Sequence, residues 1–210
     1  PGDHYAYLMQ FRDGTRIDLS IMPVDQLENS LREDTLTAVL LDKDGIAGEL
    51  PPASDAGYLP TPPTEKQYDD CTNEFWWLNP YVAKGLWRGE LIGPKFFLDV
   101  LMRAQLQKML NWYYGLQTGF EKSPGKMGRF FPEVFGEALW RQVQQTYSNH
   151  EPDSIWNALF TMGEVFRQVA QPVAAHFGYR YPQQEDTEVS AFIRKVKTLP
   201  LKAVTFDSQE

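Results

Sequence analysis

The 210-residue sequence has a single cysteine, Cys71, and only three histidines. One cysteine cannot form a disulfide within the chain, which is typical of a reducing compartment and predicts a cytoplasmic protein. His4, His150 and His176 are scattered, and none has the spacing of a zinc ligand set. These shortages exclude an internal disulfide scaffold and argue against a zinc enzyme.

Long apolar runs and positive charge are also in short supply. No run reaches the roughly 18 apolar residues of a membrane-spanning helix, so we expect no membrane partner. The 20 Lys and Arg residues are outnumbered by 28 Asp and Glu residues, and the net charge is −8. Such a chain repels phosphate backbones, so we expect no nucleic-acid partner. The charge balance suits a cationic partner, or an anion that meets a local basic spot.

The first clear pattern is a β-hairpin that carries a carboxylate. Residues 5–11 are extended and aromatic, Asp13-Gly14 is a strong hairpin-turn signal, and residues 17–22 form an apolar strand. Because side chains alternate along a strand, Asp18 shares a face with Arg16. An Asp in mid-strand needs a partner such as a cation, an arginine or water. Two interpretations follow: Asp18 pairs with Arg16 on a solvated face, or it belongs to an active site.

The rest of the chain divides at a proline-rich stretch. A short helix is predicted over residues 23–31 and a further strand over 36–41. Residues 46–63 contain five prolines and read as a connector. We therefore predict a partial domain over residues 1–45, the connector over 46–63, a helical domain over 64–198 and a C-terminal tail over 199–210.

Helical periodicity dominates after the connector. Thr64-Glu65-Lys66-Gln67 is a capping box that predicts a helix start. Apolar stripes at steps of three and four predict further helices with short loops, hence an antiparallel bundle. Cys71 falls on the first stripe and is expected to be buried and inert, whereas Asp69-Asp70 and Glu185-Asp186 are expected to be solvated. Pro80 is expected to kink its helix or to restart it, and Pro172 to kink its helix.

One helix face combines charge and aromatic rings. The spacing of Glu74, Trp77, Tyr81, Lys84 and Arg88 places them on one side if the helix continues through Pro80. Such a face could bind a charged, ring-containing ligand, but an ordinary solvated face has the same pattern. The loop over residues 125–129 likewise reads as an anion-binding loop or as a plain connection, and it lacks the spacing of a P-loop.

Several short motifs, in order, resemble the streptomycin (aminoglycoside 6-) adenylyltransferase family. The resemblance covers about residues 5 to 196. It is carried by Tyr7-Leu8-Met9-Gln10-Phe11, Asp13-Gly14, Arg16-Ile17-Asp18-Leu19, Leu40-Leu41-Asp42-Lys43-Asp44, Pro51-Pro52-Ala53-Ser54-Asp55, Asn73-Glu74-Phe75-Trp76-Trp77, Lys84-Gly85-Leu86-Trp87-Arg88, Gly125-Lys126-Met127-Gly128, Ile155-Trp156-Asn157, His176-Phe177 and Tyr179-Arg180-Tyr181-Pro182.

The resemblance implies an α+β fold, in which the C-terminal part of a polymerase-β-like nucleotidyltransferase sheet domain is followed by an antiparallel helical bundle. It implies transfer of AMP from Mg-ATP to a hydroxyl of a cationic aminoglycoside, which confers antibiotic resistance. It makes Asp18 the third acidic residue of the catalytic site, completing a Mg²⁺ site or deprotonating the attacking hydroxyl. From residue type and position, Lys84 and Arg88 are predicted to contact the nucleotide. Glu74, Trp77 and Trp87 are predicted to contact the aminoglycoside.

The family's Gly-Ser turn and paired Asp-x-Asp strand precede the hairpin, and these 210 residues do not contain them. We therefore expect the chain alone to be inactive, and an upstream segment to restore activity. One alternative is a non-catalytic remnant that binds an aminoglycoside or a nucleotide. Another is a catalytically dead partner that pairs through an exposed half-domain, and an oligomer is compatible with either.

Overall fold

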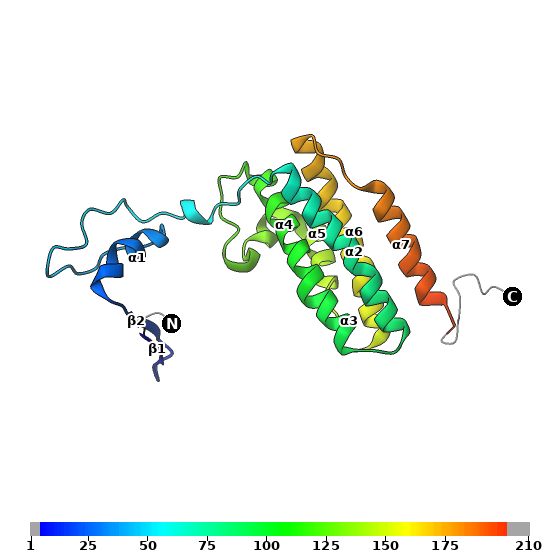
Figure 1. The fold of residues 1–210 in the computed structure, drawn as a ribbon, viewed down its shortest axis with the longest axis horizontal. Coiled ribbons are helices and arrows are strands. Elements are labelled where there is room, and N and C mark those ends of the chain that lie inside the picture. Colours follow the sequence, from blue (N-terminus) through cyan, green and yellow to red (C-terminus); the bar gives the residue numbers. More distant parts are fainter. Residues whose placement is uncertain (1–4, 201–210) are drawn as a thin grey trace. The chain divides into compact units, whose positions relative to one another are not determined.

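The computed structural model describes residues 5–200. Residues 1–4, with His4, and most of the predicted tail lie outside the described residues. The chain divides into two compact units, and the boundary lies between Tyr58 and Leu59 (Figure 1). This boundary falls inside the stretch predicted to be a connector.

The first unit begins with the predicted hairpin. Strands β1 (Tyr5–Gln10) and β2 (Arg16–Ile21) form a two-stranded antiparallel sheet in which Leu8 is opposite Asp18. In the turn, Asp13 Oδ1 accepts a hydrogen bond from the Thr15 N–H at 2.9 Å. Gly14 has φ of +89°, a conformation that favours glycine. The turn chemistry thus gives the predicted hairpin.

After the hairpin, the short helix was predicted correctly and the strand was not. A 3₁₀ turn, η1 (Val24–Gln26), leads into α1 (Leu27–Glu33). Residues 36–41 form no strand, which corrects the prediction, because an isolated extended segment leaves its backbone groups without partners. Backbone and side-chain hydrogen bonds organise the segment instead: Thr35 O accepts from the Ser54 N–H at 2.8 Å, and the Tyr58 hydroxyl donates to Asp34 at 2.7 Å. A second 3₁₀ turn, η2 (Ala56–Tyr58), ends the unit.

The second unit is a bundle of helices joined by short loops. Figure 1 shows its long helices lying side by side. In chain order they are α2 (Glu65–Trp87), α3 (Ile92–Phe96), the π-helix η3 (Phe97–Met102), α4 (Arg103–Thr118), the 3₁₀ turn η4 (Lys126–Gly128), α5 (Phe131–Gln145), α6 (Pro152–Phe177) and α7 (Gln183–Thr198). With the hairpin, this makes the α+β fold that was predicted.

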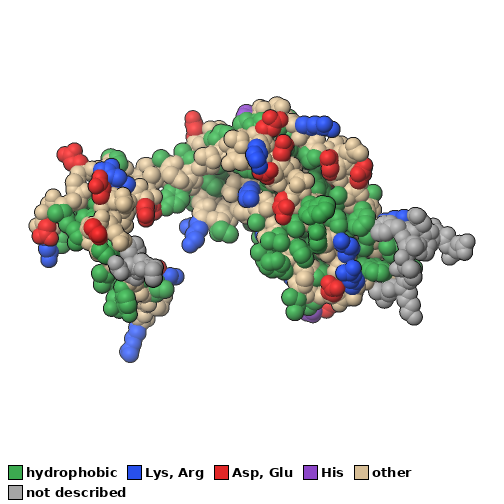
Figure 2. Space-filling view, viewed as in Figure 1, with side chains coloured by type: hydrophobic (Ala, Val, Ile, Leu, Met, Phe, Trp, Pro, Cys, Tyr) green, Lys and Arg blue, Asp and Glu red, His purple; other side chains and the backbone are tan. Residues whose placement is uncertain are grey.

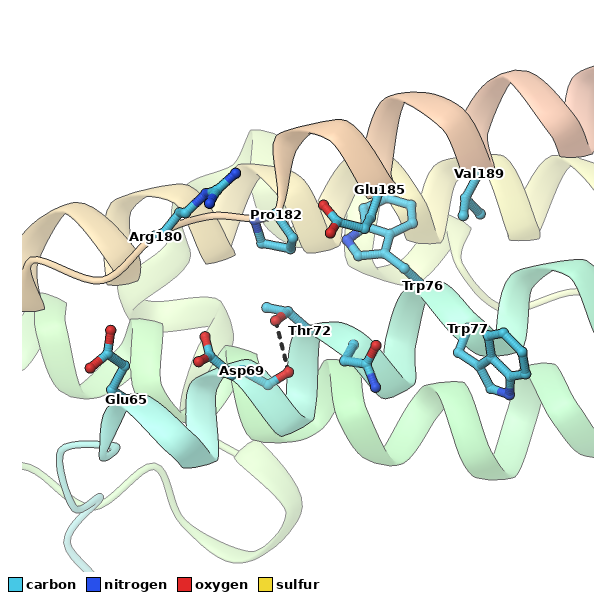
Figure 3. Close-up of a pocket in the computed structure, with 10 residues that line it drawn as sticks. Glu65, Asp69, Thr72, Trp76, Trp77, Arg180, Pro182, Glu185 and Val189 are labelled. Carbon is cyan, nitrogen blue, oxygen red and sulfur yellow. Dashed lines mark hydrogen bonds between the residues drawn. The ribbon is translucent and has the colours of Figure 1, made fainter.

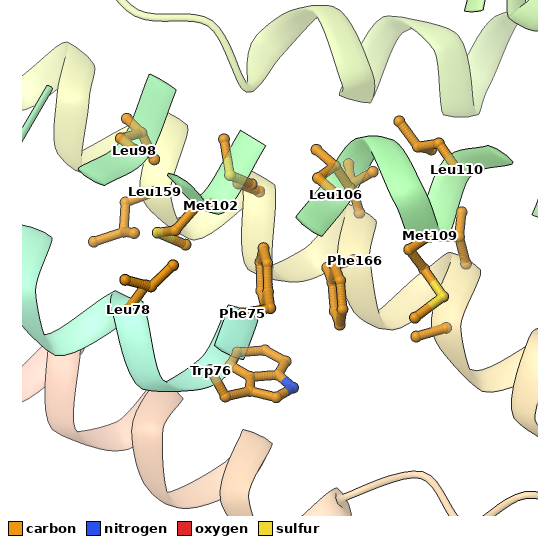
Figure 4. Packing of buried hydrophobic residues seen from close by; sticks show 14 of the residues in the cluster. Phe75, Trp76, Leu78, Leu98, Met102, Leu106, Met109, Leu110, Leu159 and Phe166 are labelled. Atoms are coloured by element: carbon orange, nitrogen blue, oxygen red, sulfur yellow. The ribbon is translucent and has the colours of Figure 1, made fainter. Parts of the chain in front are cut away.

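Helix α2 organises the bundle. Its capping box is formed as predicted: the Gln67 N–H donates to Thr64 Oγ1 at 3.2 Å, and Thr64 N–H donates to Gln67 Oε1 at 2.8 Å. The helix continues through Pro80. Its apolar stripe is buried, and Phe75 stacks on Phe166 of α6 with 3.7 Å between ring centroids (Figure 4). The periodicity that predicted this helix is therefore the pattern of its buried face.

Two further expectations concern single residues. Cys71 is buried and inert as predicted, and burial raises the pKa of its thiol to about 12. Asp186 is fully buried, which corrects the expectation that it is solvated. No helix among residues 5–200 is long and apolar enough to cross a membrane.

Candidate functional site

Asp18 lies in β2, where Arg16 holds it. Arg16 Nε donates to Asp18 Oδ1 at 3.0 Å, and Arg16 Nη2 donates to Asp18 Oδ2 at 2.9 Å. Both side chains are exposed, at 65% for Arg16 and 48% for Asp18. This is the solvated pairing that the sequence suggested. An exposed ion pair stabilises a protein by about 1 kcal/mol at most, so Asp18 can exchange Arg16 for another cation at little cost.

A Mg²⁺ site needs more oxygen ligands than Asp18 supplies. Mg²⁺ prefers near-octahedral coordination by several oxygens. Within residues 5–200, no group of three or more His, Cys, Asp or Glu residues is placed to hold a metal ion. The described residues therefore do not fit a Mg²⁺ site by themselves.

The structure brings the predicted charged and aromatic residues onto one face of α2. Because the helix passes through Pro80, Glu74, Trp77, Lys84 and Arg88 follow one outer face, and Trp77 is 62% exposed. At 1.5 Å per residue, Glu74 and Arg88 are about 21 Å apart along the axis. The structure therefore places the predicted aminoglycoside contact Glu74 and the predicted nucleotide contact Arg88 near different parts of the helix.

The C-terminal end of α2 has a structural explanation as well as a predicted role. Lys84 Nζ lies 4.9 Å from the centre of the Tyr81 ring, and the Arg88 N–H caps the helix end at Lys84 O. Cations there complement the helix dipole. Trp87 is half-buried, and its Nε1–H donates to Leu199 O at 3.2 Å. Binding roles for Lys84, Arg88 and Trp87 remain predictions.

The most suggestive cavity lies between α2 and the start of α7. We call it the acidic groove; Figure 3 shows its two walls, and its volume is about 470 Å³. The α2 wall carries acidic and aromatic side chains, and the second wall comes from the α6–α7 loop and α7. The lining residues are Glu65, Asp69, Thr72, Asn73, Trp76, Trp77, Arg180, Pro182, Glu185 and Val189.

Negative charge dominates the acidic groove. Three carboxylates, Glu65, Asp69 and Glu185, are balanced by only one cation, Arg180. Figure 2 shows acidic side chains over the start of α2 and the start of α7. All three carboxylates are exposed. The groove can therefore attract a cation and offer it the exposed ring of Trp77.

A buried ion pair fixes the second wall of the acidic groove. Arg167 of α6 donates to both carboxylate oxygens of Asp186 at 2.5 Å, and the Tyr181 hydroxyl donates to Asp186 Oδ2 at 2.7 Å. Burial raises the pKa of Asp186, but the hydrogen bonds from Arg167, Tyr181 and Ser190 outweigh it and hold the pKa below its ordinary value. The first turn of α7, which presents Glu185, is thus anchored to α6.

A second groove lies next to the acidic groove, beyond Asn73 and toward α4. Its volume is about 510 Å³, and it is lined by Gln67, Asp70, Cys71, Asn73, Glu74, Gln105, Lys108 and Trp112. Asp70 already pairs with Lys66 at 2.5 Å. The two predicted contacts are thus divided between the grooves. Glu74 lines the second groove, Trp77 lines the acidic groove, and Asn73 lines both.

Glu65, Asp69 and Glu185 were not assigned to a binding site from the sequence; Asp69 and Glu185 were expected to be solvated, and both are exposed. The spacing of Glu65, Asp69, Thr72 and Trp76, at steps of four, three and four, already places them on one face of α2. This spacing could have predicted the α2 wall of the groove from the sequence. Glu185 could not be found this way, because it reaches the groove only through the packing of α7 on α2.

Comparison with known proteins gives a consistent result. The family model described as streptomycin adenylyltransferase matches residues 1–196. An aminoglycoside 6-adenylyltransferase of Campylobacter jejuni is 33% identical over 193 residues, which cover 92% of this chain and 67% of that protein. One of Bacillus subtilis is 32% identical over 186 residues, 88% of this chain and 66% of that protein. The chain thus spans about two thirds of the length of these relatives.

Structural similarity points the same way. A crystal structure of an aminoglycoside 6-adenyltransferase from Bacillus subtilis aligns with a TM-score of 0.61 and 26% identity. The alignment covers 94% of this chain and 73% of that one. The similarity therefore extends over most of the chain.

Proposed function

This chain belongs to the streptomycin adenylyltransferase family, a family of nucleotidyltransferase enzymes, and on this premise we propose that it serves the transfer of AMP from Mg-ATP to a hydroxyl of an aminoglycoside. The relatives are named aminoglycoside 6-adenylyltransferases. Modification of such an antibiotic is a means of resistance. The single cysteine, Cys71, which has no disulfide partner within the chain, supports a cytoplasmic setting, where ATP is available.

The observation that carries the proposal is the acidic groove. Aminoglycosides are polycations built on hydroxyl-bearing rings, so they need carboxylates for their ammonium or guanidinium groups and flat surfaces for their rings. The groove offers Glu65, Asp69 and Glu185 beside two tryptophans. Its volume of about 470 Å³ lies in the ordinary range for small-molecule sites. The same charges repel a triphosphate, which favours the acceptor over the nucleotide as its ligand.

Within this proposal, Trp77 stacks on or covers the bound aminoglycoside. Glu74, in the second groove on the other side of Asn73, extends the negative surface for a long polycation. Trp87 contributes through packing at the end of α2. Lys84 and Arg88 are the proposed nucleotide contacts, since both are exposed cations on the outer face of this helix.

The reaction needs one proton acceptor. The acceptor hydroxyl oxygen forms a bond to the α-phosphorus of ATP while the bond from that phosphorus to the pyrophosphate oxygen breaks. The hydroxyl proton must leave as this happens. Asp18 is the proposed base or metal-site carboxylate, and because its pair with Arg16 is exposed to solvent, Asp18 can exchange Arg16 for another partner in either role.

Calorimetric titration with streptomycin tests the acceptor groove. We expect the 210-residue chain to bind streptomycin, and Glu185→Gln to weaken binding about five-fold, as expected for one exposed charge contact of about 1 kcal/mol. Glu188→Gln, an exposed position of α7 outside the groove, is the control and should bind like wild type. Equal affinity of wild type and Glu185→Gln would place the acceptor elsewhere.

A further inference from the structure

One donor at the wall of the acidic groove has no partner. Trp76 is only 2% exposed, and its indole Nε1–H is buried without a hydrogen-bond acceptor. A buried donor left unpaired destabilises the protein, because it has lost its hydrogen bonds to water and gained none in return. Native proteins rarely leave such a group unpaired, so an unpaired donor beside a cavity indicates that an acceptor arrives with a ligand.

The orientation of Trp76 is fixed by its surroundings. The six-membered edge of the indole faces α6, where Cη2 and Cζ3 lie 3.7 Å from the position that a Cβ on Gly163 would take. Phe75 packs edge-on against the ring, with 5.1 Å between centroids. The Arg167 guanidinium, already held by Asp186, lies 5.9 Å from the Trp76 ring centre. These contacts fix the orientation of the ring against α6.

The nitrogen edge of Trp76 is turned toward the acidic groove. Figure 3 shows the indole nitrogen on the side where Glu185 lies. The Glu185 side chain is exposed and comes from the opposite wall.

We propose that Trp76 is a specificity-determining residue, whose Nε1–H donates a hydrogen bond to an oxygen of the aminoglycoside in the acidic groove. This inference rests on the proposed function. An indole nitrogen can only donate. Its partner must therefore be a hydroxyl, ether or carbonyl oxygen, while the carboxylates take the cationic groups.

The consequence is discrimination between otherwise similar sugars. An ammonium group carries only donors, so at this position it would face the Trp76 N–H without forming a bond. A site with a polar group left unpaired by the wrong ligand discriminates more strongly than an apolar pocket does. The groove should therefore prefer a ligand with oxygen at this position over one with an ammonium group.

Nuclear magnetic resonance of the indole N–H groups tests this directly. The Trp76 signal is the one that Trp76→Phe removes. In wild type we expect streptomycin to move this signal downfield, as it does when an N–H gains an acceptor. We expect Trp76→Phe to weaken streptomycin binding about five-fold. Trp156→Phe, which replaces a buried tryptophan of α6 outside the groove, should leave binding unchanged.

The outcomes separate this inference from the proposed function. If wild type binds streptomycin and Glu185→Gln weakens binding, but the Trp76 signal does not move and Trp76→Phe binds normally, Trp76 has no such role while the groove assignment stands. If Glu185→Ala shifts the Trp76 signal upfield before any streptomycin is added, the acceptor is Glu185, and the inference is overturned. If wild type binds no streptomycin, both are overturned.

Discussion

At the scale of single residues, Asp18 combines a modest structural role with a proposed chemical one. Its pair with Arg16 is exposed on both sides. Replacing the carboxylate by an amide of similar shape should therefore leave the hairpin intact, because little stability depends on the pair. A loss of activity in such a variant would report on chemistry rather than on folding.

Asp18→Asn is the corresponding prediction. In a chain that also carries the family's Gly-Ser turn and Asp-x-Asp strand upstream, we expect turnover to fall by at least about 100-fold, the lower end of what a catalytic acid or base contributes. Circular dichroism should show an unchanged fold. Asp25→Asn, at an exposed position of η1, is the control and should retain activity. Turnover of Asp18→Asn within a few-fold of wild type would make Asp18 structural.

Asp186 provides a second prediction at this scale, about stability. Because the carboxylate is buried and the half-buried Arg167 would lose its charged acceptor, Asp186→Asn should lower the free energy of unfolding by about 2 kcal/mol at pH 7. Asp153→Asn, 91% exposed, should change it by less than about 0.5 kcal/mol. Urea denaturation measures both free energies of unfolding. If Asp186→Asn lowered this free energy no more than the control does, the Arg167–Asp186 pair would not anchor α7.

The pH dependence of that difference follows from the sign of the pKa shift. The folded-state pKa of Asp186 is below its ordinary value, so its contribution to stability is present above an unfolded pKa of about 3.9 and is lost as the pH falls through the lower folded value. The difference between wild type and Asp186→Asn should therefore shrink when denaturation is repeated at pH 3. A difference that grows at pH 3 would contradict the direction of the shift.

At the scale of the element, α2 shows what local chemistry can predict. Thr64 and Gln67 predicted its start, and steps of three and four predicted its buried stripe. The helix does not restart at Pro80: α2 is continuous across it, and Asn79 Nδ2 donates to Phe75 O at 2.8 Å in the same turn. The apolar stripe packed on α6 stabilises the helix through the proline.

The predicted strand over residues 36–41 shows the opposite case. Its apolar, β-branched residues matched a strand pattern, but a strand also needs a neighbour, and the described sheet has only β1 and β2. Leu40 is 96% exposed. The local pattern therefore predicted a strand, but no strand among residues 5–200 pairs with this segment.

The two charged positions on the outer face of α2 can be tested together. We expect Lys84→Ala to weaken ATP binding with little effect on streptomycin, and Glu74→Gln to do the reverse, because each change removes the charge complementary to one ligand. Lys66→Ala is the control, since Lys66 pairs with Asp70 at the start of the helix. Calorimetry with each ligand measures the effects, and unchanged affinities would leave both residues on an ordinary solvated face.

At the scale of the whole molecule, the groove depends on contacts that sequence patterns do not encode. Glu65 and Glu185 are 120 positions apart in the sequence. They line one cavity because α7 packs along α2 and the Arg167–Asp186 pair anchors its first turn. Asp186 itself looked solvated because an acidic residue in the first turn of a helix is common. The family was readable from short motifs, whereas the second wall of the acidic groove needed the structure.

The most direct test of the central claim is steady-state adenylylation of streptomycin by the chain with the upstream family segment, comparing wild type with Asp69→Asn/Glu185→Gln. If the acidic groove binds the acceptor, the double variant should raise the KM for streptomycin by about ten-fold or more while the KM for ATP stays unchanged, since two carboxylates are lost from one ligand's site only. An unchanged KM for streptomycin, or a wild type that forms no adenylylated streptomycin, would contradict the account.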